Sequence, residues 1–169
     1  MRERRSTQHR RRTREFETYV AGAGGRLLHA ATLLTAEHPD ANPRAQHLLA
    51  AALAQTYARW PRPHGEDPYD RTRQELAARF ARAAWRYRRP GARPQGLLAR
   101  LTPQERLILV LRLYEGVAEE QTAALVGLPA NRVRAICTRA IATMRSTPPA
   151  VRAPGAAPMG GPGEREGAP

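Results

Sequence analysis

The chain has 169 residues, with 28 basic residues that are all arginine against 15 acidic ones, and a formal net charge of +13. Its length allows one ordinary domain or two small ones, and its few β-branched runs argue against a sizeable sheet. It has no apolar run near 18 residues, no signal-peptide pattern and a single cysteine, Cys137, which exclude a spanning helix and a disulfide framework. We therefore expect an all-α cytoplasmic protein that is attracted to polyanions and not to membranes.

The N-terminal segment, residues 1–14, is predicted to be a disordered basic arm. Residues 1–15 hold seven arginines and two glutamates, and they show no apolar periodicity. A solvated tail is the simpler interpretation of such a run, and contact with phosphates is the alternative. The C-terminal tail, residues 147–169, is rich in proline, glycine and alanine and is also predicted to be disordered.

A first helical unit is predicted over residues 15–89. Apolar residues at helical spacing indicate helices over 16–35, where Gly24-Gly25 weaken the pattern, then over 44–60, and finally from about residue 68 to residue 89. Two prolines and two glycines within residues 90–96 end any helix, so this segment is predicted to be a short linker.

The third of these helices is expected to start at an Asp67 N-cap and to combine arginine with aromatic residues. Seven arginines and one glutamate accompany Phe80, Trp85 and Tyr87 between residues 71 and 89. Rings that stack on bases and cations that follow the backbone are typical of binding to single-stranded or opened nucleic acid. Alternatively, the rings belong to the core. We favour the core for Phe80 and leave both interpretations open for the other two.

A second unit, residues 97–146, is predicted to end in a helix-turn-helix. Thr102 and Glu105 have the spacing of a capping box, and the helix that they start should be buried and should end at Gly116. A short helix over about 119–126, a Gly-Leu-Pro turn and a last helix over about 130–145 follow. The fold is thus expected to be all-α, with two small helical domains on a short linker.

The last helix carries the clearest functional signal. Val133 and Ile136 mark an apolar inner face, and the opposite face contains no acid. Arginine can bind guanine or phosphate and asparagine can read adenine, so this face is predicted to enter a major groove of DNA; a merely solvated amphipathic helix is the alternative. The predicted reading residues are Asn131, Arg132, Arg134, Ala135, Thr138 and Arg139. Cys137 should be a core residue, and we expect no metal, no cofactor and no enzymatic activity.

The order of these elements resembles a bacterial RNA polymerase sigma factor of the extracytoplasmic-function (ECF) type. The resemblance covers about residues 16–146 and is strongest in the sequence LTPQERL…LRLYEG of residues 101–116 and in EEQTAALVGLP…VR of residues 119–134. It implies that residues 15–89 form a region 2-like domain, which binds the polymerase clamp and opens the −10 element. Residues 97–146 would form a region 4-like domain, which reads the −35 element.

The resemblance also implies two further sets of site residues. The −10 or melting helix would use Arg79, Arg82, Trp85, Arg86 and Tyr87. The polymerase-contact helix would use Gln46, His47, Leu48, Ala50 and Ala51. Family members usually have an acidic, polar stretch on that helix, whereas this chain has His-Leu-Leu-Ala-Ala at residues 47–51. Binding to core RNA polymerase is therefore expected to be weaker than is usual for the family.

The leading hypothesis is a sigma factor-like protein that directs promoter recognition and transcription initiation, with promoter DNA and core polymerase as partners. One alternative is a stand-alone helix-turn-helix regulator, derived from a sigma factor, that no longer binds core polymerase. The other alternative is a protein-interaction module that docks on an anti-sigma-type regulator through the alanine- and leucine-rich helix over residues 44–60.

Overall fold

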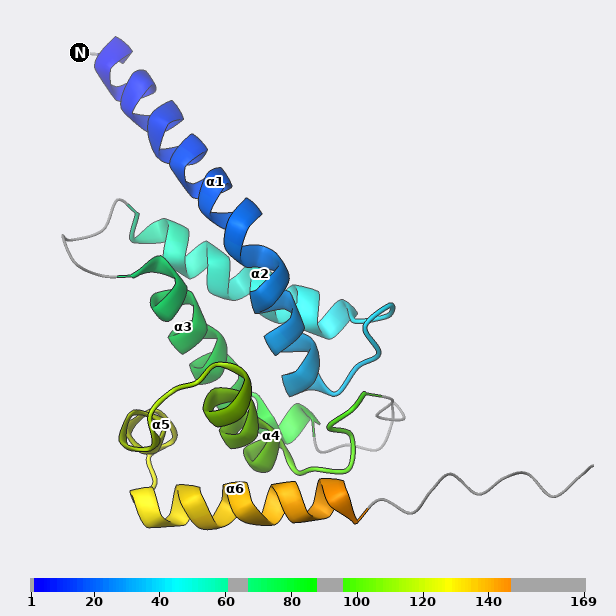
Figure 1. Cartoon of the computed structure of the whole chain (residues 1–169). Helices are drawn as coiled ribbons and strands as arrows, with labels where there is room; N and C mark the ends of the chain where they lie inside the picture. Colours follow the sequence, from blue (N-terminus) through cyan, green and yellow to red (C-terminus); the bar gives the residue numbers. More distant parts are fainter. Residues whose placement is uncertain (1, 61–66, 88–95, 147–169) are drawn as a thin grey trace, which may run out of the picture.

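The computed structural model describes residues 2–60, 67–87 and 96–146, and this part of the chain is helical (Figure 1). The only strand-like feature in these ranges is an isolated bridge between His38 and Ala41. The all-α prediction is confirmed. The elements are α1 (Arg2–Thr35), α2 (Pro43–Ala58), α3 (Pro68–Arg82), the 3-10 helix η1 (Ala84–Tyr87), α4 (Pro103–Leu109), the π-helical turn η2 (Val110–Tyr114), α5 (Glu119–Val126) and α6 (Ala130–Arg145). No described helix is long and apolar enough to cross a bilayer.

Helix α1 corrects the prediction of disorder for residues 1–14, because residues 2–14 continue the helix without a break. Arginine is a good helix former, and local and distant contacts hold this stretch. Arg11 forms an ion pair with Glu15 at 2.9 Å. On the opposite side, Arg12 donates a hydrogen bond to the carbonyl of Tyr57 and lies over its ring, and Thr13 lies 3.2 Å from the Tyr57 hydroxyl. The contacts with α2 could not be seen in the apolar pattern.

Helices α1, α2 and α3 form the first unit around aromatic and threonine contacts. The ring of Phe16 lies 4.9 Å from that of Tyr57 and 5.3 Å from that of Trp60. The Tyr19 hydroxyl donates to Thr72 Oγ1 at 2.7 Å, and Thr72 is fully buried. The ring contacts hold α1 against the end of α2, and the Tyr19 bond holds α1 against α3.

Helix α3 begins as predicted and ends earlier than predicted. Asp67 caps it by accepting a hydrogen bond from the Tyr69 backbone N–H. The helix stops at Arg82 rather than near residue 89, because the chain turns into η1 and stacks Tyr87 on Phe80 with ring centroids 4.8 Å apart. The predicted core position of Phe80 is confirmed, since its side chain has no exposed surface.

The second unit starts with the predicted capping box between Thr102 and Glu105. The helix widens into η2, where the Glu115 N–H bonds to the Val110 carbonyl at 2.9 Å, and the element ends before Gly116, which has a φ of 68°. The wide turn puts the carboxylate of Glu115 against the first unit. There it accepts from the Tyr69 hydroxyl at 2.9 Å. Burial, followed by the Glu115 contact, raises the pKa of Tyr69.

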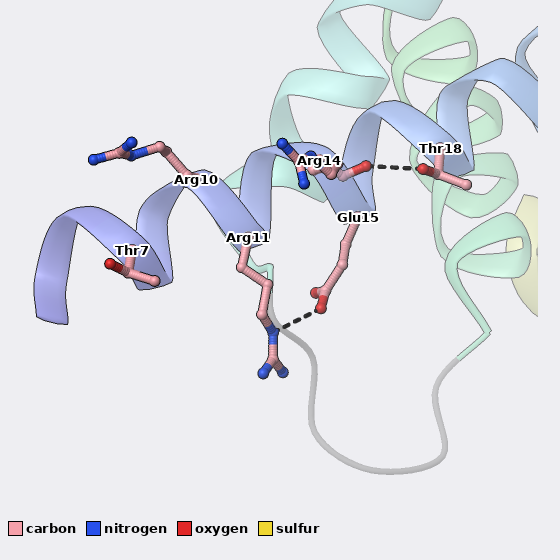
Figure 2. Close-up of a pocket in the computed structure, with 6 residues that line it drawn as sticks. All are labelled: Thr7, Arg10, Arg11, Arg14, Glu15 and Thr18. Atoms are coloured by element: carbon pink, nitrogen blue, oxygen red, sulfur yellow. Dashed lines mark hydrogen bonds and ion pairs between the residues drawn. The ribbon is translucent and has the colours of Figure 1, made fainter.

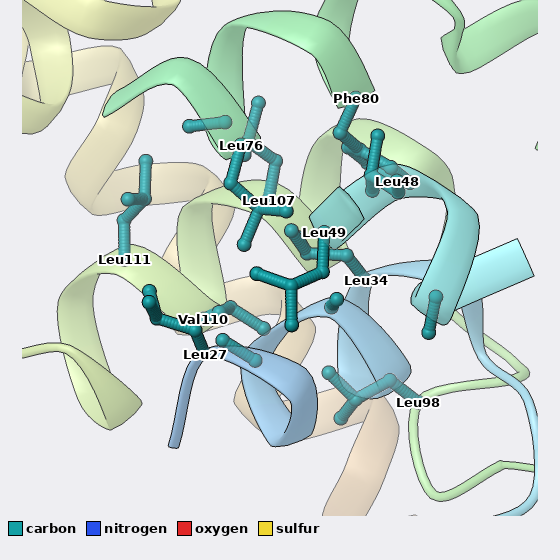
Figure 3. Packing of buried hydrophobic residues seen from close by; sticks show 14 of the residues in the cluster. Leu27, Leu34, Leu48, Leu49, Leu76, Phe80, Leu98, Leu107, Val110 and Leu111 are labelled. Carbon is teal, nitrogen blue, oxygen red and sulfur yellow. The ribbon is translucent and has the colours of Figure 1, made fainter. Parts of the chain in front are cut away.

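The two units share one hydrophobic core, which the sequence did not predict. Figure 3 shows side chains of α1, α2 and α3 packed against those of α4 and η2. Below this core, a smaller cluster of Ile108, Ala123, Val133 and Ile136 supports the helix-turn-helix. The shared core contains Leu27, Leu34, Leu48, Leu49, Leu76, Phe80, Leu98, Leu107, Val110 and Leu111. The predicted linker, apart from Gly96, and the predicted tail lie outside the described residues.

Arg106 joins the two units at the end of α1. Its side chain is 3% exposed, and it donates to the carbonyl of Leu34 at 2.8 Å and to that of Tyr87 at 3.3 Å. The Leu34 carbonyl lies in the last turn of α1, where carbonyls lack partners within the helix and attract cations. Burial lowers the pKa of Arg106 to about 10. Gly96 approaches the residues that follow α1 so closely that a Cβ would lie 2.6 Å from the Glu37 carbonyl oxygen.

Candidate nucleic-acid interface

Helices α5 and α6 and their turn have the geometry of a helix-turn-helix. Gly127 ends α5 in the left-handed region, with φ 68° and ψ 35°, which glycine adopts at little cost. The Leu128 N–H then bonds to the Ala123 carbonyl at 3.1 Å, and Pro129 precedes the first turn of α6. In Figure 1, helix α6 lies across one end of the molecule, far from the start of α1.

The two faces of α6 are as predicted from the helical period. Val133, Ile136 and Ala140 are buried, and Cys137 is half-buried on the same side, where burial raises the pKa of its thiol. The whole predicted reading set is exposed: Asn131, Arg132, Arg134, Ala135, Thr138 and Arg139. A face of arginine, asparagine and small residues can approach the base edges of a groove.

Two carboxylates from other helices reach this face, and the sequence analysis missed them. Glu119 of α5 forms two hydrogen bonds with Arg134, at 2.8 and 3.1 Å. Glu105 of α4 accepts from Arg139 Nε at 3.1 Å. Both carboxylates are largely buried, with side chains 13% and 12% exposed, whereas the arginines are mostly exposed. A helical wheel of α6 alone contains no acid, so only the packing of α4 and α5 reveals these pairs.

The bonds of Glu105 predict that the free energy of unfolding depends on pH in the acid range. Burial alone would raise the pKa of its carboxyl, but hydrogen bonds from the Thr102 backbone and hydroxyl and from Arg139 outweigh burial and lower it below 4.5. A lowered folded-state pKa contributes stability above the unfolded value, and this contribution is lost as the pH falls through the folded value. We expect the free energy of unfolding of wild type to decrease below about pH 4.5.

Glu105→Gln tests this expectation, because glutamine can keep the capping box but cannot titrate. Urea unfolding of both proteins between neutral and acid pH measures the difference. The variant should be less stable at pH 7, and its stability should depend less on pH in the acid range. Parallel pH profiles for the two proteins would contradict the assignment.

The predicted −10 residues divide between surface and core. Trp85 is 57% exposed, and the Arg86 guanidinium lies 5.1 Å above its ring. Arg79 pairs with Glu75 at 2.7 Å, and Arg82 lies 3.7 Å from the same carboxylate. Tyr87 is half-buried against Phe80, and burial raises its pKa, so it belongs to the packing rather than to this exposed face.

The predicted polymerase-contact residues are also only partly at the surface. Gln46, His47 and Ala50 of α2 are exposed, and Ala51 is half-buried. Leu48 is 6% exposed and lies in the shared core, so its assignment to a contact surface is corrected. The reason is the helical period, which turns residue 48 toward α1 and α3 while its neighbours face outward.

Comparison with known proteins found one family that matches the second unit and curated proteins that are similar to most of the chain. Residues 97–146 match the family described as sigma-70, region 4. The chain is 29% identical over 153 residues to the RNA polymerase sigma-E factor of Streptomyces coelicolor, covering 78% of this chain and 84% of that protein. The RNA polymerase sigma-E factor of Streptomyces avermitilis is 29% identical over the same length, with 78% and 83% covered. No solved structure matches the chain.

Proposed function

We propose that this chain, which is similar to bacterial RNA polymerase sigma factors, is a sigma factor of the ECF type that directs promoter recognition and transcription initiation by RNA polymerase. The outward face of α6 carries this proposal. It presents three arginines and one asparagine above a buried apolar face, on a helix that follows a glycine turn. In this role the protein works by binding and not by catalysis, in the cytoplasm where DNA and polymerase are found.

The proposed contacts follow from exposure. Helix α6 reads the −35 element with Asn131, Arg132, Arg134, Ala135, Thr138 and Arg139. Arg82, Trp85 and Arg86 contact the −10 region, with the Trp85 ring available to stack on an unpaired base, a contact typically contributing about 1–3 kcal/mol. The other two residues of the −10 set support that surface. Arg79 shares the Glu75 carboxylate with Arg82, and Tyr87 stacks on the buried Phe80.

One experiment separates this function from the alternatives. The purified chain is mixed with core polymerase, and both co-migration and promoter-dependent transcripts are measured. Transcripts together with co-migration support the sigma factor. DNA binding without co-migration supports a stand-alone regulator, which the exposed alanine at position 50 and the histidine at position 47 favour. An anti-sigma-type regulator as main partner has less support, because Leu48 and Leu49 are buried and leave little apolar surface on α2.

The α2 surface leads to a prediction about core polymerase. Sigma factors of this type usually present acids here, but α2 contains none. We expect His47→Asp combined with Ala50→Glu to raise the affinity for core polymerase about tenfold, if two rim charge pairs each contribute about 0.5–1 kcal/mol. A binding titration with fluorescent core polymerase measures the change.

The matched control is His47→Asn with Ala50→Gln, which has similar shape and no charge. It should bind core polymerase as wild type does. If wild type binds as tightly as an ordinary sigma factor and the acidic variant changes nothing, the role assigned to this surface is wrong.

A further inference from the structure

The first three turns of α1 project beyond the three-helix unit and form a surface that the proposed function does not use. Figure 1 shows this segment leaving the bundle at the end of the molecule opposite α6. Every residue between positions 4 and 11 whose side chain is described is exposed. The segment is therefore separate from the reading helix, and just beyond it Arg12 and Thr13 contact Tyr57.

Arginines collect on the free side of this segment. With about 100° per residue, Arg4, Arg10, Arg11 and Arg14 lie within one broad face, and Arg12 points to the packed side. We call these four residues the arginine arm. An open pocket of about 500 Å³ lies along it, lined by Thr7, Arg10, Arg11, Arg14, Glu15 and Thr18 (Figure 2).

The charges of the arginine arm are only partly neutralised. Arg11 pairs with Glu15 at 2.9 Å, and its side chain stays 81% exposed. No ion pair joins Arg10 or Arg14 to an acid within the described part of the chain, and the Arg10 guanidinium extends away from the helix in Figure 2. Because these two residues are four apart on a helix, their like charges repel each other. A polyanion would relieve this repulsion.

The face has the chemistry of a phosphate contact rather than of a membrane contact. A helix that lies in a lipid surface needs an apolar face to insert. Here the apolar and aromatic side, which includes Phe16 and Tyr19, is already packed against α2, and the side chains that line the pocket are arginine, threonine and glutamate. Guanidinium groups bind phosphate oxygens in bidentate geometry and stay charged at any cellular pH.

We propose that the arginine arm is a sequence-independent binding surface for the phosphate backbone of duplex DNA, distinct from the reading and melting surfaces. This inference rests on the proposed function, which supplies the DNA. Residues 2–11 span about 15 Å along the helix axis, and duplex DNA presents about nine charges over that length. The arm would hold DNA outside the two promoter elements without reading bases.

The test compares two double variants of the full chain on a fluorescent duplex of random sequence across a range of salt concentrations. Arg10→Gln with Arg14→Gln should reduce the slope of log affinity against log salt by about 1.8, for two lost phosphate contacts. Arg44→Gln with Arg100→Gln removes the same charge from exposed positions outside the arm and should leave the slope near that of wild type. Circular dichroism should be alike in all three proteins.

Two results overturn the proposal. If both double variants lower the slope equally, or neither changes it, the arm makes no specific phosphate contact. If the arm variant loses binding to phosphatidylserine vesicles but keeps its DNA slope, the surface serves a membrane instead. The preference for promoter over random duplex, which α6 would set, should be unchanged in the arm variant, so failure here is distinguishable from failure of the proposed function.

Discussion

Replacing Arg106 with alanine should lower the free energy of unfolding by about 3–5 kcal/mol, the range for truncating a large buried side chain and orphaning its hydrogen-bond partners. The substitution leaves the carbonyls of Leu34 and Tyr87 without their donor and opens a space beside Phe80, over whose ring the guanidinium lies at 5.9 Å. Chemical denaturation followed by circular dichroism measures the change.

The result should also reveal how the two units unfold. Arg106 is surrounded by residues of both units, and the core is continuous across the junction. Far-UV signal and tryptophan fluorescence should therefore report one common transition, at lower denaturant than in wild type. Arg106→Met fills the space without donating hydrogen bonds and should fall between alanine and wild type.

The control for this prediction is Arg100→Ala, at an exposed position of the same unit. A surface substitution of this kind normally changes stability by less than about 0.5 kcal/mol. A loss below about 1 kcal/mol in Arg106→Ala, or two separated transitions in wild type, would contradict the structural role assigned to this arginine.

The second large effect concerns DNA. Combined replacement of Arg132, Arg134 and Arg139 with alanine should weaken binding to a promoter duplex by at least about a hundredfold, taking about 1 kcal/mol for each lost contact. If all three contact phosphates, the salt slope should fall by about 2.7. Fluorescence anisotropy at several salt concentrations measures both quantities. The thermal midpoint should fall moderately, because the largely buried carboxylates of Glu119 and Glu105 lose their arginine partners, but the protein should stay folded because the inner face of α6 is intact.

A substitution of Glu119 tests the same reading face, but it should raise DNA affinity rather than lower it. Its carboxylate holds Arg134, so this arginine must exchange a carboxylate for a DNA group on binding. Glu119→Gln should raise affinity for any duplex, whereas Glu120→Gln makes the same charge change next door without breaking that pair. Equal affinities in the two variants would show that the pair does not limit DNA binding, and unchanged affinity in the triple alanine variant would overturn the reading face itself.

Local signals in the sequence were sufficient for three of the helix ends and for the exposure pattern of α6. Asp67, Thr102 and Gly116 each act through bonds or backbone angles within a few residues, so their roles are visible in a short window. The exposure pattern of α6 follows from the helical period alone, since one side must cover the small core around Val133.

Features that depend on distant parts of the chain were not predictable in this way. The helicity of residues 2–14 depends partly on Tyr57, more than 40 residues away, and the partners of Arg134 and Arg139 come from two other helices. Leu48 was assigned to a contact surface by resemblance, although its side chain fills the core that α1 and α3 share with α2. In each case the missing information is which surfaces pack together, and that is a tertiary property.

The cap that Arg106 places on α1 also has a consequence for synthesis on the ribosome. The donor for the Leu34 carbonyl lies 72 residues later in the chain. At about 5–20 residues per second, α1 emerges about 4–14 s before the residue that completes its end. During that interval Leu27 and Leu34 lack the partners that α4 and η2 later provide, and the nascent chain exposes them as a leucine-rich segment. Slow translation after α3 would prolong this stage. We therefore expect ribosome-associated chaperones to bind the first unit while its leucines are exposed.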